Sequence, residues 1–144
     1  MRLIFPTLLA ILLAPLQVAA DNDVMPPITD ALVKKECGEC HLAFQPKFLP
    51  EPSWRKIMAT PPNHFGEDAS LKPDIRVKVG AYLATNADGR RVNPDNPPLQ
   101  ITKLFWFRDE HGDADIKKQM RKLKLKSIVE CAACHKDADR GYYD

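Results

Sequence analysis

The sequence carries little net charge, and beyond its first twenty residues it has no long hydrophobic run. It contains 21 Lys and Arg residues against 19 Asp and Glu residues, which gives a formal net charge of +2. This balance argues against a protein that binds nucleic acid through bulk charge. No later segment reaches the roughly 20 apolar residues that a membrane-spanning helix needs. We therefore expect a soluble mature chain.

The first twenty residues have the pattern of a secretory signal peptide. Arg2 supplies the positive start, residues 3–16 are largely apolar, and small residues precede Asp21. An uncleaved membrane anchor is the alternative, but the apolar run is short and two prolines interrupt it. The pattern predicts a signal peptide at residues 1–20, cleavage near Ala20–Asp21, and export, most simply to a bacterial periplasm.

Cysteine and histidine are scarce, with four of each, and all four cysteines fall in two copies of the motif Cys-x-x-Cys-His. In c-type haem attachment, two thiols with this spacing form thioethers with the haem, and the next residue, His, binds the iron. One helical turn can present both sulfurs and the imidazole to one porphyrin edge. The sequence therefore predicts two covalently bound haem c groups, attached at Cys37, Cys40 and His41, and at Cys131, Cys134 and His135.

Three other uses of these cysteines fit the sequence less well. A small disulfide scaffold usually scatters its cysteines along the chain. A zinc ribbon needs its second Cys-x-x-Cys about 15–20 residues after the first, whereas here the two motifs lie almost a chain length apart. A thioredoxin-like motif would explain one pair, but neither the second pair nor the two histidines that follow.

Two histidines remain outside the motifs, and two iron atoms each need a second axial ligand. This arithmetic predicts bis-histidine coordination, with His64 and His111 as the distal ligands. Methionine is the rival ligand, since Met58 and Met120 lie within reach along the chain, and methionine ligation would raise the reduction potential. The helical spacing of both methionines with other apolar residues favours a packing role. An exchange of the two distal histidines between sites also stays open.

The chain after cleavage has about 124 residues, which is short for two independent hydrophobic cores. Each haem must therefore form much of the interior of its own domain. We predict a mainly α fold with haem domains at residues 21–92 and 93–144. The first expected helix is short, is capped by Thr29–Asp30 and leads into the first motif. Further helices are expected from about Ser53, from Leu71 to about Ala84 with Ser70 as N-cap, and after Gly112. Residues 99–107 could form a short strand or an extended segment.

A run of six basic residues lies in the second half of the chain, between residues 117 and 126. A solvated helix face is the simpler interpretation. The functional alternative is a docking surface for an acidic redox partner, which would accelerate encounter more than it strengthens binding. The residues are Lys117, Lys118, Arg121, Lys122, Lys124 and Lys126.

The sequence resembles the bacterial dihaem cytochrome c family over nearly all of the mature chain. The similar segments are residues 35–41, the Trp54 region, residues 64–70 and 81–83, and, in the second half, residues 101–102, Trp106, His111, residues 126–127 and 131–135, and the Gly141–Tyr142 tail. The resemblance implies a class I cytochrome c-like N-terminal domain and a small, mostly irregular or helical C-terminal domain. It also implies bis-histidine haems with His64 and His111 at the distal positions. A monohaem, oxygen-binding class I cytochrome c would be the electron acceptor, and a membrane cytochrome b a donor.

These observations predict a periplasmic electron carrier with no enzymatic activity of its own. If both axial positions of each iron are filled, neither iron can bind oxygen, peroxide or nitrite without losing a ligand. The alternative is a small peroxidase or nitrogen-oxide reductase in which one distal histidine dissociates. The absence of a further histidine to act as an acid or base near the iron weakens this alternative.

Overall fold

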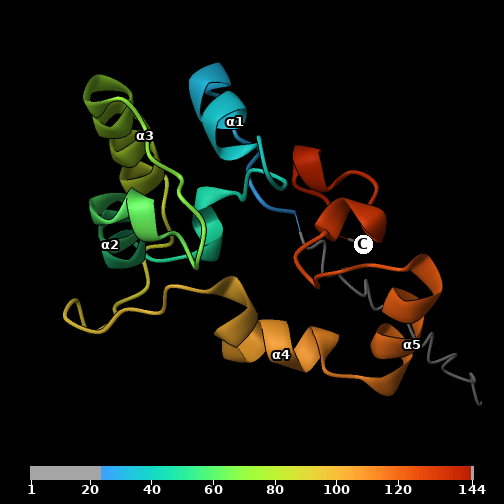
Figure 1. Ribbon diagram of the computed structural model, residues 1–144. Coiled ribbons are helices and arrows are strands. Elements are labelled where there is room, and N and C mark those ends of the chain that lie inside the picture. Colours follow the sequence, from blue (N-terminus) through green and yellow to red (C-terminus); the bar gives the residue numbers. More distant parts are fainter. Residues whose placement is uncertain (1–23, 144) are drawn as a thin grey trace, which may run out of the picture.

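The computed structural model describes residues 24–143, and the regular structure in this range is helical. β-type pairing among these residues is limited to isolated bridges. The prediction of a mainly α fold is therefore confirmed. The helices, labelled in Figure 1, are α1 (Ala31–Cys37), α2 (Glu51–Ala59), α3 (Pro73–Thr85), α4 (Phe105–His111) and α5 (Ala114–Leu123), with short 3-10 turns at Pro46–Phe48, Pro61–Asn63, Ile101–Lys103, Cys131–Ala133 and Ala138–Arg140.

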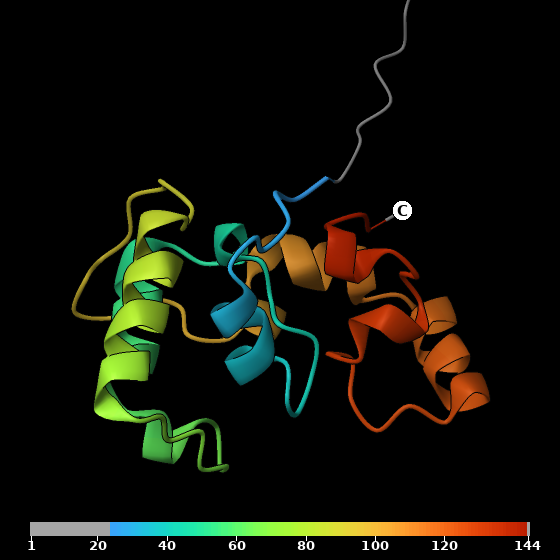
Figure 2. The ribbon, with the colours of Figure 1, turned by 90° about the horizontal axis from the view of Figure 1, so that it is seen from above.

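The two halves of the sequence occupy opposite ends of the molecule. α2 and α3 lie side by side at one end, while α5 and the C-terminal segment lie at the other. α1 and α4 lie between these ends (Figures 1 and 2). The predicted domain boundary between residues 92 and 93 falls in irregular backbone, and it stays a prediction. The predicted signal peptide lies outside the described residues.

The hydrophobic core comes almost entirely from the first half of the chain. Partly buried Ile101 and Leu104 pack against it from the second half. From α4 onward, the buried hydrophobic side chains among the described residues are only Phe107 and Ala138. The second half therefore has too few buried apolar side chains for a core of its own. The core of the first half consists of Ile28, Val33, Leu49, Trp54, Val79, Leu83 and Ala87.

α1 begins where the sequence predicts it. The Asp30 carboxylate accepts hydrogen bonds from the backbone N–H groups of Leu32 (2.8 Å) and Val33 (3.1 Å), which satisfies two of the donors that a helix N-terminus leaves free. Val33 faces the core. This short helix delivers Cys37 to its end, directly before the first haem-attachment motif.

The predicted N-cap of α3 is wrong. The helix begins at Pro73, and Lys72, not Ser70, occupies the N-cap position without a side-chain hydrogen bond. The Ser70 N–H donates instead to the Asp68 carboxylate (2.9 Å) in a local turn before the helix. Pro73 can stand in the first helical turn because the N–H that it lacks would have no helical partner there.

The expectation of a strand or extended segment at residues 99–107 is also wrong. This stretch forms a 3-10 turn followed by the first residues of α4. Phe107 is buried, and His111 follows one helical turn later with its ring stacked on that of Phe107 (4.1 Å between centroids, 7° between planes). The β-branched and aromatic composition suggested a strand, but buried Phe107 and partly buried Leu104 and His111 are spaced as on one face of a helix.

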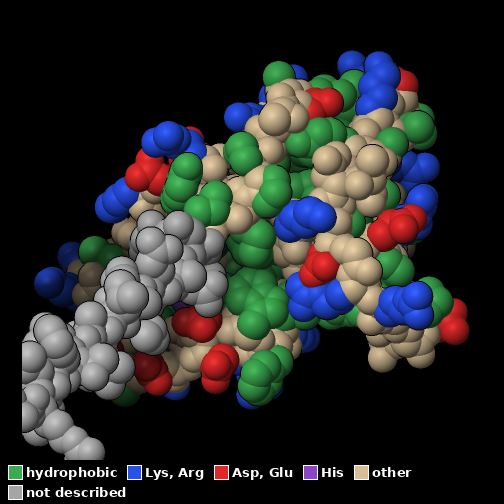
Figure 3. All heavy atoms as spheres, turned by 180° about the vertical axis from the view of Figure 1, so that it is seen from behind, with side chains coloured by type: hydrophobic (Ala, Val, Ile, Leu, Met, Phe, Trp, Pro, Cys, Tyr) green, Lys and Arg blue, Asp and Glu red, His purple; other side chains and the backbone are tan. Residues whose placement is uncertain are grey.

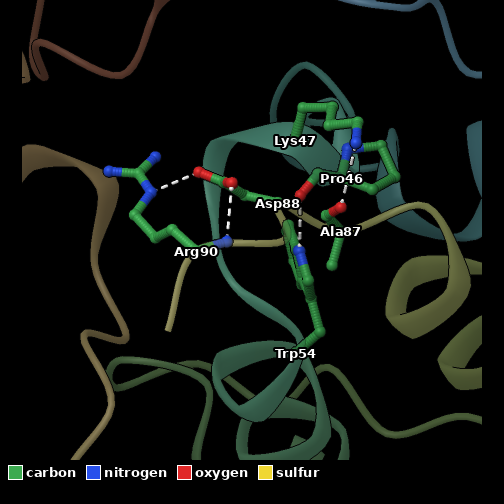
Figure 4. A network of polar contacts seen from close by, with 6 residues as sticks. All are labelled: Pro46, Lys47, Trp54, Ala87, Asp88 and Arg90. Carbon is green, nitrogen blue, oxygen red and sulfur yellow. Dashed lines mark hydrogen bonds and ion pairs between the residues drawn. The ribbon is translucent and has the colours of Figure 1, made fainter. Parts of the chain in front are cut away.

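A proline-rich loop at residues 45–50 is fastened to the first half of the molecule by several hydrogen bonds. The Trp54 indole N–H donates to the carbonyl of Pro46 (2.8 Å), and the Lys47 ammonium donates to the carbonyl of Ala87 (3.2 Å) (Figure 4). The N–H of Asp88 donates to the carbonyl of Leu49 (3.0 Å). Arg90 forms an ion pair with Asp88 and points away from the loop (Figure 4). These bonds fix the backbone on both sides of Phe48.

Charged side chains of both signs are interspersed on the face shown in Figure 3, and hydrophobic side chains gather between them. This distribution agrees with the near-neutral composition of the chain. Within residues 24–143, no helix has both the length and the apolar character required to cross a membrane.

Candidate functional site

The first predicted site brings together His41 and His64, which are far apart in sequence. Their ring centroids lie 6.3 Å apart, and the two ring planes differ by only 22°. The Nδ1 of His41 donates a hydrogen bond to the carbonyl of Leu42 (2.7 Å). This bond leaves Nε2 as the metal-binding nitrogen, and it is the kind of outer hydrogen bond that orients metal-bound histidines. Phe44 stacks on His41 (4.7 Å), and Phe65 meets His64 edge-on (4.8 Å).

The second predicted site brings together His111 and His135. Their ring centroids are 6.1 Å apart, but here the planes differ by 64°. The Nδ1 of His111 donates to the carbonyl of Phe107 (3.0 Å), one helical turn earlier in α4. This bond leaves Nε2 of His111 as the metal-binding nitrogen. Tyr143 lies beside His135, with the ring centroids 5.4 Å apart.

Both pairs have the separation expected of two imidazoles that share one metal ion. Imidazole nitrogens bind metals at about 2 Å, and each lies roughly 1 Å from its ring centre, so two rings on opposite sides of one metal have centroids about 6 Å apart. Both pairs match this distance. Burial, with a smaller contribution from nearby His41, lowers the pKa of His64, which favours the neutral imidazole that binds metals.

The surroundings of the cysteines argue against the zinc and disulfide alternatives. None of the four cysteines forms a disulfide. Burial, reinforced by the Glu36 carboxylate, raises the pKa of the Cys37 thiol to about 11, and burial also raises the pKa of Cys131. Both thiols are therefore protonated at neutral pH. Residues 24–143 also contain no cluster of three or more His, Cys, Asp or Glu side chains that could hold a metal ion without a porphyrin.

The rival ligand Met58 has a packing role. It is partly buried against the core of the first half, and the backbone of α3 approaches it closely at Gly80, where an added Cβ would lie 3.6 Å from the Cβ of Met58. Met120 lies on α5, a helix without fully buried residues.

Sequence reasoning missed the residues that join the two sites. Gln45 is 1 % exposed, and its side-chain amide donates to the carbonyl of Ala138 (2.7 Å) while its carbonyl oxygen accepts from the Tyr143 hydroxyl (2.5 Å). Burial raises the pKa of the Tyr143 phenol, so the hydroxyl stays protonated and donates. A buried glutamine has no sequence signature, because glutamine is usually exposed.

A comparison with models of protein families supports the haem sites that the two histidine pairs indicate. A family model described as dihaem cytochrome c matches residues 33–143, which include both Cys-x-x-Cys-His motifs, His64 and His111. The chain belongs to the dihaem cytochrome c family. The resemblance noted in the sequence is therefore confirmed, and the prediction of two haem c groups is confirmed with it. Membership of this family implies electron transfer.

Solved structures of dihaem cytochromes c are similar to the chain over most of its length. A diheme cytochrome c from Rhodobacter sphaeroides is 38% identical and has a TM-score of 0.73, with 82% of this chain and 99% of that chain covered. The diheme cytochrome c from Shewanella baltica OS155 is 32% identical and has a TM-score of 0.67, with 79% and 86% covered. A search of curated protein sequences found no match.

Proposed function

We propose that this dihaem cytochrome is a periplasmic carrier that passes single electrons through two low-potential, bis-histidine haems to a partner cytochrome. The observation that carries the proposal is the spacing of the two histidine pairs, since each matches two imidazoles on one iron. When bound, each haem supplies an iron that alternates between ferric and ferrous states and so holds one electron. Two imidazole ligands favour a lower potential than a histidine–methionine pair.

In this assignment, the first haem is tethered by Cys37 and Cys40 and its iron is ligated by His41 and His64. The second is tethered by Cys131 and Cys134 and ligated by His135 and His111. The backbone carbonyls of Leu42 and Phe107 hold the ring orientations of His41 and His111. Aromatic side chains pack against the ligands and limit the access of water, which also lowers the polarity around each iron.

The different ring angles of the two pairs provide a direct test by electron paramagnetic resonance of the oxidised protein. Nearly parallel imidazole planes give low-spin ferric haem a rhombic signal, whereas strongly inclined planes give a highly anisotropic signal with one large g value. We expect the first type from the His41–His64 site and the second from the His111–His135 site, in equal amounts. A near-infrared band diagnostic of methionine–iron ligation would contradict the assignment.

Carbon monoxide binding distinguishes the carrier from the haem enzyme. With four histidine ligands in place, carbon monoxide should leave the Soret band of the reduced protein unchanged. H64A and H111A should each open one iron and shift about half of the Soret absorbance. The matched controls M58L and M120L should behave like the unaltered protein. A shift of half the absorbance in the unaltered protein would favour the peroxidase or nitrogen-oxide reductase alternative.

The proposed electron acceptor is a monohaem, oxygen-binding class I cytochrome c, and a membrane cytochrome b is the proposed donor. The basic residues of α5 and of the segment after it are exposed, and they would attract an acidic acceptor surface. The double variant K118E/K122E should slow reduction of the acceptor about tenfold at low ionic strength and much less at high ionic strength. R76E/K78E, on exposed positions of α3, is the charge-matched control. Equal slowing by both variants would contradict docking at α5.

Export is tested on the protein recovered from the periplasm of an expressing bacterium. Its N-terminal residue should be Asp21, and its mass should exceed that of residues 21–144 by two haem groups. Recovery of the chain with residues 1–20 attached and in the membrane fraction would favour the uncleaved anchor.

A further inference from the structure

The two histidine pairs are connected by aromatic rings in contact, and the connection passes through one residue, Phe48. On the side of the first site, Phe44 stacks on His41 (4.7 Å) and meets Phe48 edge-on (6.5 Å). On the side of the second site, Phe48 stacks on Trp106 (5.7 Å, 18°) and meets Tyr143 edge-on (5.2 Å). Phe48 thus belongs to the first half of the chain but touches two rings of the second.

Two branches run from Phe48 to the second site, one to each histidine. Tyr143 leads directly to His135 (5.4 Å between centroids). Trp106 leads through Phe107 (5.7 Å) to His111 (4.1 Å). Chains of neighbouring rings therefore connect Phe48 to both predicted ligands of the second site. On the side of the first site, one chain of rings connects Phe48 to His41 through Phe44.

Phe48 is also held more firmly than a surface aromatic would be. It is 6 % exposed, at the end of the 3-10 turn Pro46–Phe48. The hydrogen bonds from Trp54 and Lys47 fasten this loop to the first half (Figure 4). The buried Gln45 fastens the same loop to the second half through Ala138 and Tyr143. The loop that carries Phe48 is therefore hydrogen-bonded to both halves of the chain.

We propose that Phe48 is the residue through which electrons exchange between the two haem sites. The proposal rests on the function proposed above. One electron leaves the reduced site and arrives at the oxidised site, so oxidation at one balances reduction at the other, and no bond or proton changes place. Phe48 is a positioning residue and is neither oxidised nor reduced. Tunnelling decays faster across a void than through atoms in van der Waals contact, and close packing around Phe48 removes such a void.

The test is the rate of intramolecular electron exchange in partly reduced holoprotein. Proton NMR resolves the haem methyl signals of the oxidation states, and their exchange rate, extrapolated to zero protein concentration, excludes transfer between molecules. F48L keeps an apolar side chain but removes the planar contact with Trp106 and Tyr143, and we expect it to slow exchange at least tenfold. Y142L, which removes a 41 % exposed ring off the route, should exchange at the unaltered rate.

Electron paramagnetic resonance spectra of the variants distinguish a failure of this proposal from a failure of the proposed ligand assignment. If F48L retains both low-spin signals and exchanges as fast as the unaltered protein, the proposal is overturned. If the unaltered protein itself lacks two bis-histidine signals, the proposed function fails, whatever the exchange rate. If F48L loses a site, F44L provides the same measurement on the single branch beside the first site, and an unaltered rate in F44L overturns the proposal.

Discussion

At the scale of single residues, Gly141 allows the backbone of the C-terminal segment to approach the backbone at Met25. Its φ is +90°, and an added Cβ would lie 1.9 Å from the carbonyl oxygen of Met25. The N–H of Met25 donates to the carbonyl of Gly141 (2.7 Å). Only glycine permits both the backbone conformation and this close approach. The residue lies two positions before Tyr143, so a displacement here would move the ring beside His135.

We predict that G141A lowers the free energy of unfolding by about 2 kcal/mol or more, because backbone strain and a steric clash act together. G66A is the matched comparison, since Gly66 also has a positive φ (+105°) but nothing within 4 Å of an added Cβ. It should cost roughly 1 kcal/mol, from strain alone. Urea unfolding of the holoprotein, followed by circular dichroism, measures both. Equal losses in the two variants would mean that the Met25 contact is unimportant.

At the scale of helices, the sequence predicted well where a local interaction decides the structure. The cap at Asp30 and the helix after Gly112 are confirmed. The prediction failed at residues 99–107, where tertiary packing of Phe107 overrode the strand propensity of the composition. It also placed the α3 cap at Ser70, because it did not recognise the turn made by Asp68.

The same distinction applies to the candidate sites. Each attachment motif is a contiguous stretch of five residues, so the sequence alone predicts covalent haem attachment there. Counting the ligands that two irons need predicted His64 and His111 as the distal histidines but left their pairing open, and only the family resemblance implied a pairing. The structure places His64 beside His41 and His111 beside His135. The junction at Phe48, Gln45 and Tyr143 joins residues more than ninety positions apart. No periodicity or motif in the sequence marks such a contact.

The cap of α1 supports a prediction at the scale of the helix. D30A removes the acceptor of two backbone N–H groups in a helix of seven residues and should lower the free energy of unfolding by about 1 kcal/mol. D30S should restore most of this loss, because serine is also a good N-cap. D113A is the control, since Asp113 at the N-cap of α5 makes no side-chain capping bond. Urea unfolding that finds D113A as damaging as D30A would contradict the capping argument.

At the scale of the whole molecule, the two halves differ in how they are stabilised. The first half has a core of seven buried residues, in which α3 packs against both α2 and α1. The second half contributes only Phe107 and Ala138 as buried hydrophobic side chains among the described residues. A haem would therefore supply most of the apolar interior there. The second half should depend on its cofactor for folding, much as small metal-binding domains depend on their metal.

This asymmetry predicts how the protein behaves without haem. Chain produced in a cytoplasm that lacks haem-attachment enzymes should retain some amide protection in α2 and α3, because their mutual packing does not require a porphyrin. Amides of α4, α5 and the segment to residue 143 should exchange at nearly the rate of an unfolded chain. Hydrogen exchange followed by mass spectrometry resolves these segments, and the holoprotein, measured in parallel, should protect both halves. Equal protection of the two halves in the haem-free chain would show that the second half has a core that its buried side chains do not reveal.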